Sequence, residues 1–222
     1  MTNTIRFATS NMFKRLTAKQ SRRHVNKVLP LVDVVGWQEV TRVHRKTLIK
    51  KRAEGWETYF SDKVGGLAIS WRADRFEVYR EGRSHRAVPG IPLDPDRGFI
   101  TIVLKDLLTG ELWPIIVAHM THQAWTSHPE RRYRWWIQAG RLRWKSRRLK
   151  RRFGRMVGLG DVNRHHWAPK GTIGAWPAGG TLGRAKYDVI WRKGKVEKRG
   201  PIAALNTPSD HHTAIASLGA AA

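Results

Sequence analysis

The sequence predicts an α/β fold built of strand and helix layers, and two patterns indicate this class. Short runs rich in valine and isoleucine recur along the chain, as buried or half-buried strands do. Longer helix-like stretches lie between these runs. Because both types of segment alternate along the chain, layers of helices and strands are favoured over an all-helical or an all-β fold.

The expected elements follow from these patterns in chain order. The apolar runs predict strands at residues 5–10, 33–38, 67–71, 99–104, 114–119, 155–160, 187–191 and 213–218. Basic stretches that directly follow two of these strands predict helices at 13–28 and 41–52. The longest helix is expected at 129–152, and one side of it is marked by residues spaced three or four apart: Tyr133, Trp136, Ile137, Gly140 and Trp144. Two connections rich in glycine and proline, 87–97 and 168–183, are expected to be loops.

The chain has the size and composition of one domain with its own core. It has 222 residues, of which 41% are hydrophobic, too many for a wholly disordered protein. No internal repeat or long linker divides it, so residues 1–222 are expected to form a single domain. No apolar stretch approaches the roughly 20 residues that span a bilayer, and residues 1–11 lack the apolar segment of a signal peptide. A cytoplasmic protein without a membrane span is therefore the expectation.

The charge of the chain is strongly positive. Lys and Arg number 42 against 17 Asp and Glu, which gives a formal net charge of +25. Such an excess repels itself unless a polyanion neutralises it, and it attracts nucleic acid or an anionic membrane. Charge alone leaves open a ribosomal-type protein that only packs against RNA. Cysteine is absent, so disulfides, thiolate nucleophiles and cysteine zinc sites are excluded, and any metal would need oxygen or nitrogen ligands.

Polar groups follow several of the expected strands, and one set is Gly160-Asp161-Val162-Asn163. Alternation points Asp161 and Asn163 to the same side of an extended segment. An aspartate there can orient or deprotonate a water, and an asparagine amide can hold a phosphate oxygen without adding negative charge. A glycine–aspartate turn capped by the aspartate side chain explains the same four residues without any chemistry.

Two more candidates end apolar runs. Glu39 follows the run 34–38, and a carboxylate buried there without a partner would be costly, so it would need a metal or a cation. Alternatively, Glu39 only precedes the helix at Thr41, where an acid suits the positive end of the helix dipole. His119 closes the run 115–118 and could donate to a phosphate or a leaving oxygen, although a lone histidine at a strand end also serves a purely structural role.

The C-terminal part supplies acids close to an imidazole. Asp188 precedes an apolar run, and it could orient an imidazole as the acid of a catalytic triad does, or simply start a strand. Ser209-Asp210-His211 places an acid beside an imidazole before the last expected strand, and histidine suits acid–base work near neutral pH. A plain turn before a strand explains the same three residues.

The order of these pieces resembles the endonuclease/exonuclease/phosphatase superfamily, which contains deoxyribonuclease I, exonuclease III and inositol polyphosphate 5-phosphatases. The pieces cover nearly the whole chain, and they are Asn11 after the first strand, Gln38-Glu39, His119, Asp161-Val162-Asn163, Asp188 and Ser209-Asp210-His211. The resemblance implies a four-layer α/β sandwich, in which two packed mixed β-sheets are flanked by helices.

The resemblance also implies a role for each piece. Glu39 matches the glutamate that binds Mg²⁺, with Asn11 and Asp210 close to the metal, and hard oxygen ligands suit Mg²⁺ or Mn²⁺ better than zinc. Asp161 matches the residue that positions the attacking water. Asn163 matches the residue that holds the phosphate. Asp188 and His211 match an acid–imidazole pair, and His119 matches a histidine seen in many members.

Two positions depart from the superfamily's pattern. Some members carry an acid two residues after the first-strand asparagine, where this chain has Phe13. Deoxyribonuclease I-like members place an acid before the strand at 67–71 to partner the histidine, but this chain has Lys63-Val64-Gly65-Gly66 there, with Asp62 as a poor substitute. A proton-donor role of His119 would therefore lack its usual acidic partner.

The segment 131–155 has many Arg and Lys and no Asp or Glu, and tryptophans are interleaved with them. Arginine pairs with phosphates in a bidentate manner, and exposed tryptophan stacks on bases. Nucleic-acid contacts are therefore expected from Arg131, Arg132, Arg134, Arg141, Arg143, Lys145, Arg147 and Arg148. A solvated amphipathic helix with Trp136 in the core is the alternative for part of this segment.

Together these observations predict a Mg²⁺-dependent phosphodiesterase, and specifically a nuclease that hydrolyses a DNA or RNA backbone with little sequence specificity. No obligate protein partner is evident. A phosphoinositide or phospholipid phosphoesterase of the same fold and a non-catalytic, basic nucleic-acid-binding protein are the alternatives.

Overall fold

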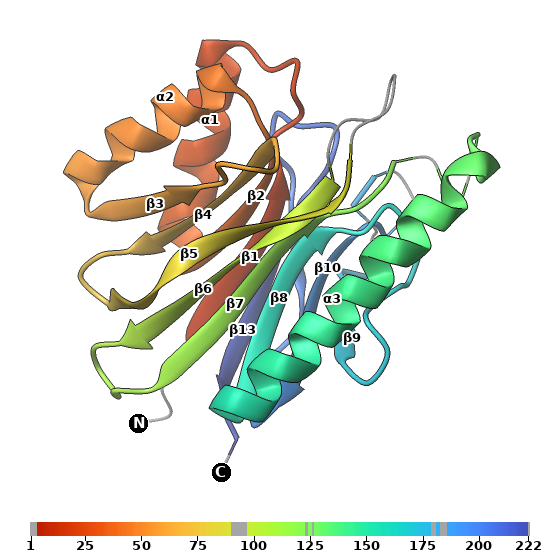
Figure 1. Ribbon diagram of the computed structural model, residues 1–222. Helices are drawn as coiled ribbons and strands as arrows, with labels where there is room; N and C mark the ends of the chain where they lie inside the picture. The colour runs from red at the N-terminus through yellow and green to blue at the C-terminus, as the bar shows by residue number, and fades with distance from the viewer. Residues whose placement is uncertain are drawn as a thin grey trace.

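The computed structural model describes residues 4–89, 97–122, 124–125, 127–178, 181–182 and 186–221, and two β-sheets lie face to face within them (Figure 1). Helices α1 and α2 cover the outer face of one sheet, and helix α3 covers the outer face of the other (Figure 1). The predicted four-layer α/β sandwich is confirmed. None of the helices in the described part is long and apolar enough to cross a membrane.

The first sheet has seven strands, in the order β11-β13-β1-β2-β4-β3, with β12 also paired to β13. Its strands are β1 Ile5–Asn11, β2 Val34–Val40, β3 Trp56–Phe60, β4 Gly66–Arg72, β11 Val196–Lys198, β12 Ala203–Leu205 and β13 Thr213–Ala220. Strands β1 and β2 are parallel, and the other pairs are antiparallel. The C-terminal ends of β1 and β2 therefore lie at the same edge of the sheet.

The second sheet has six strands, in the order β5-β6-β7-β8-β10-β9. Its strands are β5 Phe76–Val88, β6 Arg97–Asp106, β7 Leu112–His119, β8 Arg155–Asp161, β9 Ile173–Ala175 and β10 Asp188–Gly194. Strands β7 and β8 are parallel, and β10 runs antiparallel to β8. The ends of β7 and β8 and the start of β10 thus meet at one edge.

Each helix has a definite start or end signal. Helix α1 (Ala18–Val28) begins after Thr17, which forms a capping box with Gln20, so it starts later than expected. Helix α2 (Arg42–Lys50) begins after a second capping threonine, Thr41, and a 3-10 turn, Lys51–Glu54, follows it. Helix α3 (Arg132–Phe153) follows the 3-10 turn Pro129–Arg131 and ends at Gly154, whose φ of 76° is the left-handed conformation typical of helix ends.

The core between the two sheets is apolar and tightly packed. Phe7 and Leu67 from the first sheet meet Val117 and Leu159 from the second in this layer. At Gly36 the sheets come so close that an added Cβ would lie 2.8 Å from Cγ2 of Val117. The close approach near the end of β2 brings the functional edges of both sheets together.

The side of α3 that packs on the sheet is not the one marked by the spacing, so the alternative that places Trp136 in the core is wrong. Tyr133, Trp136 and Trp144, expected on one side, are 61%, 53% and 58% exposed. The buried side carries Trp135, Gln138, Ala139, Leu142 and Leu149. The spacing does not identify the buried side, because α3 has large apolar residues on both sides. Buried Trp135 donates a hydrogen bond from its Nε1 to the carbonyl of Val162 (2.8 Å).

Five strands were not expected: β3, β5, β9, β11 and β12. Strand β5 lacks an apolar run because most of its residues are exposed or half-buried. It extends to Val88, inside the expected loop 87–97, of which residues 90–96 lie outside the described part. The expected loop 168–183 contains β9, and residues 179–180 and 183 also lie outside the described part.

Candidate active site

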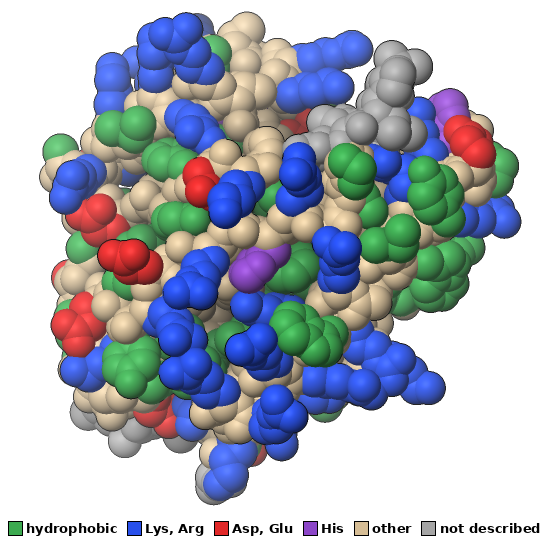
Figure 2. Space-filling view, in the orientation of Figure 1, with side chains coloured by type: hydrophobic (Ala, Val, Ile, Leu, Met, Phe, Trp, Pro, Cys, Tyr) green, Lys and Arg blue, Asp and Glu red, His purple; other side chains and the backbone are tan. Residues whose placement is uncertain are grey.

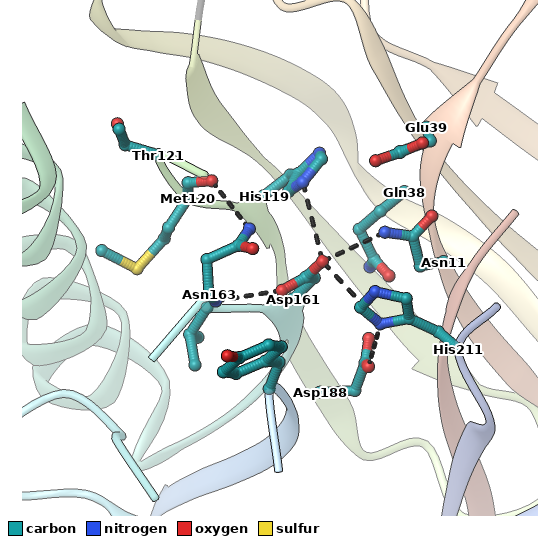
Figure 3. Close-up of polar contacts among 12 residues, drawn as sticks. Asn11, Gln38, Glu39, His119, Met120, Thr121, Asp161, Asn163, Asp188 and His211 are labelled. Carbon is teal, nitrogen blue, oxygen red and sulfur yellow. Dashed lines mark hydrogen bonds and ion pairs between the residues drawn. The ribbon is translucent and has the colours of Figure 1, made fainter. Parts of the chain in front are cut away.

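The residues singled out at strand ends lie at the common edge of the two sheets (Figure 3). Asn11 ends β1, and His119 and Asp161 end the parallel strands β7 and β8. Asp188 starts β10, and it lies opposite Asp161 of β8 in the register of the sheet. The loop before β13 contributes Asp210 and His211. Topology therefore brings together residues that are far apart in the sequence.

A cavity of about 630 Å³ opens at this edge. Residues from both sheets line it, and those with polar side chains include Lys14, Glu39, Arg97, His119, Asp161, Asn163, Asp210 and His211. Asn11 and Asp188 lie behind this lining, where they contact Asp161 and His211. The cavity thus combines acidic, basic and imidazole groups in one recess.

Asp161 is the centre of the polar network. Its Oδ1 accepts a hydrogen bond from the backbone N–H of Asn163 (2.9 Å), and its Oδ2 accepts one from Nδ2 of Asn11 (3.0 Å). Burial raises the pKa of Asp161 to about 6, and the negative charge of Asp188 adds to this effect. A carboxylate with this pKa can take up a proton near neutral pH.

Asp188 and His211 form a buried pair. Nδ1 of His211 lies 2.7 Å from Oδ2 of Asp188. Burial disfavours the charged imidazole, but the charge and hydrogen bond of Asp188, together with the charge of Asp161, outweigh it and raise the pKa of His211 to about 10. The hydroxyl of Thr181 accepts the backbone N–H of Asp188 (3.1 Å) and so fixes the start of β10. His211 is therefore a positioned, positively charged imidazole.

His119 has a different partner. Arg97, at the start of β6, places its guanidinium nitrogen 2.7 Å from Nδ1 of His119. Burial holds the pKa of His119 well below its usual range, and the charge of Arg97 lowers it further. The backbone N–H of Asp62 donates to Ser84, and its side chain is exposed, so it does not take the place of the missing acid. His119 is thus a neutral imidazole, 3.7 Å from Oδ2 of Asp161.

Three cavity-lining residues have left-handed backbone conformations that are unusual for residues other than glycine. These are Phe13, Glu39 and Asn163, with φ values of 46°, 56° and 49°. Each such residue costs on the order of 1–3 kcal/mol, and strain of this kind concentrates at functional sites. At Glu39 the pairing of β2 with β4 is irregular, and Gly66 lies so close that an added Cβ would be 3.3 Å from the Cα of Glu39. The irregularity turns the Glu39 side chain into the cavity.

The donor atoms in the cavity fit a hard divalent cation. Glu39 and Asp210 both line it, and only one oxygen of Glu39 has a hydrogen bond within the described part, from the backbone N–H of Lys14 (2.9 Å). Asn11 uses its Oδ1 to accept the N–H of Phe13 (2.9 Å). A second group of possible metal ligands lies deeper, where ligand atoms of Asp161, Asp188 and His211 are within 4.8 Å of one another.

Most of the expected nucleic-acid contacts lie on the exposed flanks of α3. Arg132, Arg141, Arg147 and Arg148 are exposed, and Arg143 and Lys145 are half-buried. Two expectations need correction, because Arg131 and Arg134 are buried, with 6% and 2% of their surface exposed. The guanidinium of Arg134 donates to the carbonyl of Pro89 (2.6 Å), so it anchors the helix to β5 instead of facing a ligand.

Arg97, Lys14 and Thr181 also contribute to the site, and the residue patterns did not identify them. Arg97 follows a proline-rich stretch and carries no motif, so only the pairing of β6 with β7 reveals its contact with His119. Lys14 contributes through its backbone N–H, which any residue could supply. No sequence motif marks Thr181 either, because its role depends on the conformation of the loop before β10.

Comparison with known proteins gives the fold but no close relative. No family model and no curated protein sequence matches the chain. Among solved structures, the human Nocturnin catalytic domain matches with a TM-score of 0.78 and 18% identity, covering 98% of this chain and 94% of that one. A mannosyl-6-phosphatase from Bacteroides thetaiotaomicron matches with a TM-score of 0.77 and 17% identity over 96% and 99% of the two chains.

A third structure, D. rerio TDP2 complexed with a single-strand DNA product, matches with a TM-score of 0.73 and 15% identity over 98% and 99% of the two chains. An endonuclease/exonuclease/phosphatase from Bacteroides vulgatus matches with a TM-score of 0.76 and 18% identity over 98% and 99%. These matches extend over nearly the whole chain. The chain therefore has the fold of the endonuclease/exonuclease/phosphatase superfamily, as the order of its sequence pieces predicts.

Proposed function

We propose that this protein is a metal-dependent phosphodiesterase that hydrolyses a nucleic-acid backbone, with DNA as the first substrate to test and RNA as the second. The observation that carries the proposal is the position of Asp161. It faces a cavity between a charged imidazole, His211, and a neutral one, His119, and its pKa of about 6 suits proton transfer near neutral pH.

The side chains have complementary roles in this proposal. Asp161 orients the attacking water and accepts its proton. Asn163 donates one amide N–H to the carbonyl of Met120 (3.1 Å) and has a second N–H for a phosphate oxygen. Asp188 holds Nδ1 of His211, so that the Nε2–H of the charged ring can donate to the phosphate.

Glu39 and Asp210 are the residues proposed to hold the cation. Asn11, the third expected ligand, lies behind the cavity lining, where it donates to Asp161 and accepts the N–H of Phe13. The deeper group of Asp161, Asp188 and His211 is a poorer choice, because the imidazolium offsets one of the two carboxylate charges and has no free nitrogen lone pair to bind a metal. A bound Mg²⁺ or Mn²⁺ would neutralise the phosphate and stabilise the leaving oxygen. Oxygen ligands favour these hard ions.

The charge of the molecule favours a polyanionic substrate. The net charge is +25, and exposed arginines with exposed tryptophans share the flanks of α3. Phosphate contacts of this type bind a nucleic-acid backbone with little dependence on sequence.

The metal requirement can be tested with a labelled DNA oligonucleotide, its RNA counterpart and a phosphoinositide, each in Mg²⁺, in Mn²⁺ and in EDTA. We expect nucleic-acid cleavage in either metal and none in EDTA. Glu39→Gln should need a higher Mg²⁺ concentration and bind Mn²⁺ more weakly in calorimetry, whereas Glu54→Gln, an exposed acid paired with Lys51, should match the wild type. Cleavage that persists in EDTA would contradict metal dependence, and phosphate release from the phosphoinositide alone would contradict the nuclease assignment.

A further inference from the structure

A second recess lies on the outer face of the second sheet, between β5 and α3. It has a volume of about 240 Å³. Six residues, which we call the basic groove, supply its Lys, Arg and Trp lining: Arg80, Arg83, Trp144, Lys145, Arg148 and Arg152. Figure 2 shows Lys and Arg side chains crowded on this face around a histidine and a large apolar side chain.

Strand β5 forms one wall of the basic groove. It is the edge strand of its sheet, and its pairing with β6 shifts register between Val78 and Arg80 and again between Arg80 and Arg83. Such bulges re-aim side chains at sheet edges. Gly82 and Ser84 face Tyr59 of the other sheet, so alternation turns Arg83 outward, toward α3.

Helix α3 forms the opposite wall. Lys145, Arg148 and Arg152 follow at spacings of three and four residues, so they share one flank of the helix. Trp144 is 58% exposed beside them, and the guanidinium of Arg148 lies 5.3 Å from the centre of its ring. The groove thus combines cations with an aromatic surface that solvent can reach.

The positive charges in the groove are poorly compensated. Among the described residues that line it, Glu81 is the only acid. Burial lowers the pKa of Lys145, and the charges of Arg148, Arg83 and Arg80 lower it further. Burial lowers the pKa of His85 to about 4, and the charge of Lys145 contributes to this shift. An anion in the groove would relieve this repulsion.

We propose that the basic groove binds single-stranded nucleic acid, with phosphates on its arginines and a base stacked on Trp144. The choice of ligand rests on the proposed function. A recess with cations on two walls fits a backbone better than a flat membrane surface, and an exposed tryptophan favours the planar bases that an acidic polysaccharide lacks.

The groove and the active-site cavity lie along the same strands. Val88 of β5 pairs with Arg97 of β6, which lines the active-site cavity. Arg83 and Val88 are five positions apart, a length of about 17 Å along a strand at ~3.3 Å per residue. A single nucleic-acid strand bound in the basic groove could therefore continue into the active-site cavity.

The test is binding of a labelled 15-nucleotide oligo(dT) in EDTA, so that cleavage plays no part, measured by fluorescence anisotropy at several salt concentrations. Arg80→Gln with Arg83→Gln should weaken binding about tenfold and reduce the salt slope by roughly 1.4, since each phosphate contact on a single strand contributes about 0.7. The matched control removes two exposed charges from the opposite layer, Arg22→Gln with Lys46→Gln, and should bind like the wild type.

Trp144→Ala should weaken oligo(dT) binding about fivefold or more and leave heparin binding unchanged. Equal losses in the groove and control variants would overturn the proposal, because binding would then follow net charge alone. Loss of heparin binding equal to that of oligo(dT) in Trp144→Ala would overturn the stacking role. Preferential binding to anionic lipid vesicles would overturn the choice of ligand. Because no outcome depends on turnover, failure of the groove and failure of the proposed catalytic function are distinguishable.

Discussion

Asp161 lies between two buried histidines whose surroundings drive their pKa values in opposite directions. His211 and His119 are similarly buried, with 7% and 5% of their surface exposed. His211 contacts Asp188 and has a raised pKa, whereas His119 contacts Arg97 and has a lowered one. Burial opposes charge on both rings, so the charge of the neighbour decides the sign.

The difference gives the cavity two imidazoles with fixed and distinct roles near neutral pH. His211 is a charged donor beside the proposed phosphate position, and His119 is a neutral ring that can accept or donate one hydrogen bond. His119 contacts Arg97 instead of an acid and stays in the site as a neutral ring. The positive charge is on His211.

The largest effect is expected when the partner of His211 loses its charge. Asp188→Asn removes both the hydrogen-bonded carboxylate and the main charge that raises the pKa of His211. We expect nuclease activity to fall about 10²–10⁴-fold, as for other positioned acid–base groups, and the pKa of His211 to drop in NMR titration of the metal-free protein. Unchanged titration of His211 would show that Asp188 does not control it.

A smaller effect, on stability, comes from a third buried histidine that has no acidic partner. His24 is fully buried against Ser10 (2.7 Å), and burial, aided by the charge of His44, lowers its pKa to about 4 from 6.5. Between pH 6.5 and pH 4, His24 binds a proton in the unfolded chain but stays largely neutral in the folded protein. Stability should therefore be unaffected above pH 6.5 and fall by up to about 3 kcal/mol toward pH 4.

Urea unfolding at a series of pH values checks this prediction. The pH slope between 6.5 and 4 should be smaller in His24→Gln than in the wild type. His128→Gln, which changes a half-exposed histidine beside Glu130, should keep the wild-type slope. Identical slopes in all three proteins would contradict the account of burial as the cause.

The smallest effect is expected on the other side of Asp161. Arg97→Gln removes the cation beside His119, so the pKa of His119 should rise while burial still holds it below its usual value. Activity should change by about tenfold or less, because His119 can still form one hydrogen bond. A loss as large as that of Asp188→Asn would show that Arg97 itself binds the substrate.

The positions of the central strands, and of the residues that end them, could be predicted from the sequence. Buried strands need apolar runs, so β1, β2, β7 and β8 were visible, and Asn11, Glu39, His119 and Asp161 could be found at their ends. Strand β5 was not visible, because an exposed edge strand rich in arginine lacks such a run. The groove that it forms with α3 was hidden for the same reason.

Contacts between distant elements could not be predicted from residue patterns. The pairing of Asp188 with His211 came from the superfamily resemblance, and the contact of Arg97 with His119 came only from the structure. The buried side of α3 could not be decided from the sequence, because Trp135 and Trp136 are adjacent and equally apolar. Only the packing against β8 distinguishes them.

The central claim, that Asp161 acts on a phosphodiester at the common edge of the two sheets, is tested most directly by cleavage of a labelled oligonucleotide in Mg²⁺ by a matched pair of variants. Asp161→Asn should reduce the rate at least about 10²-fold, and Asp62→Asn, an exposed aspartate away from the cavity, should cleave at the wild-type rate. Equal rates for the wild type and Asp161→Asn would contradict the account.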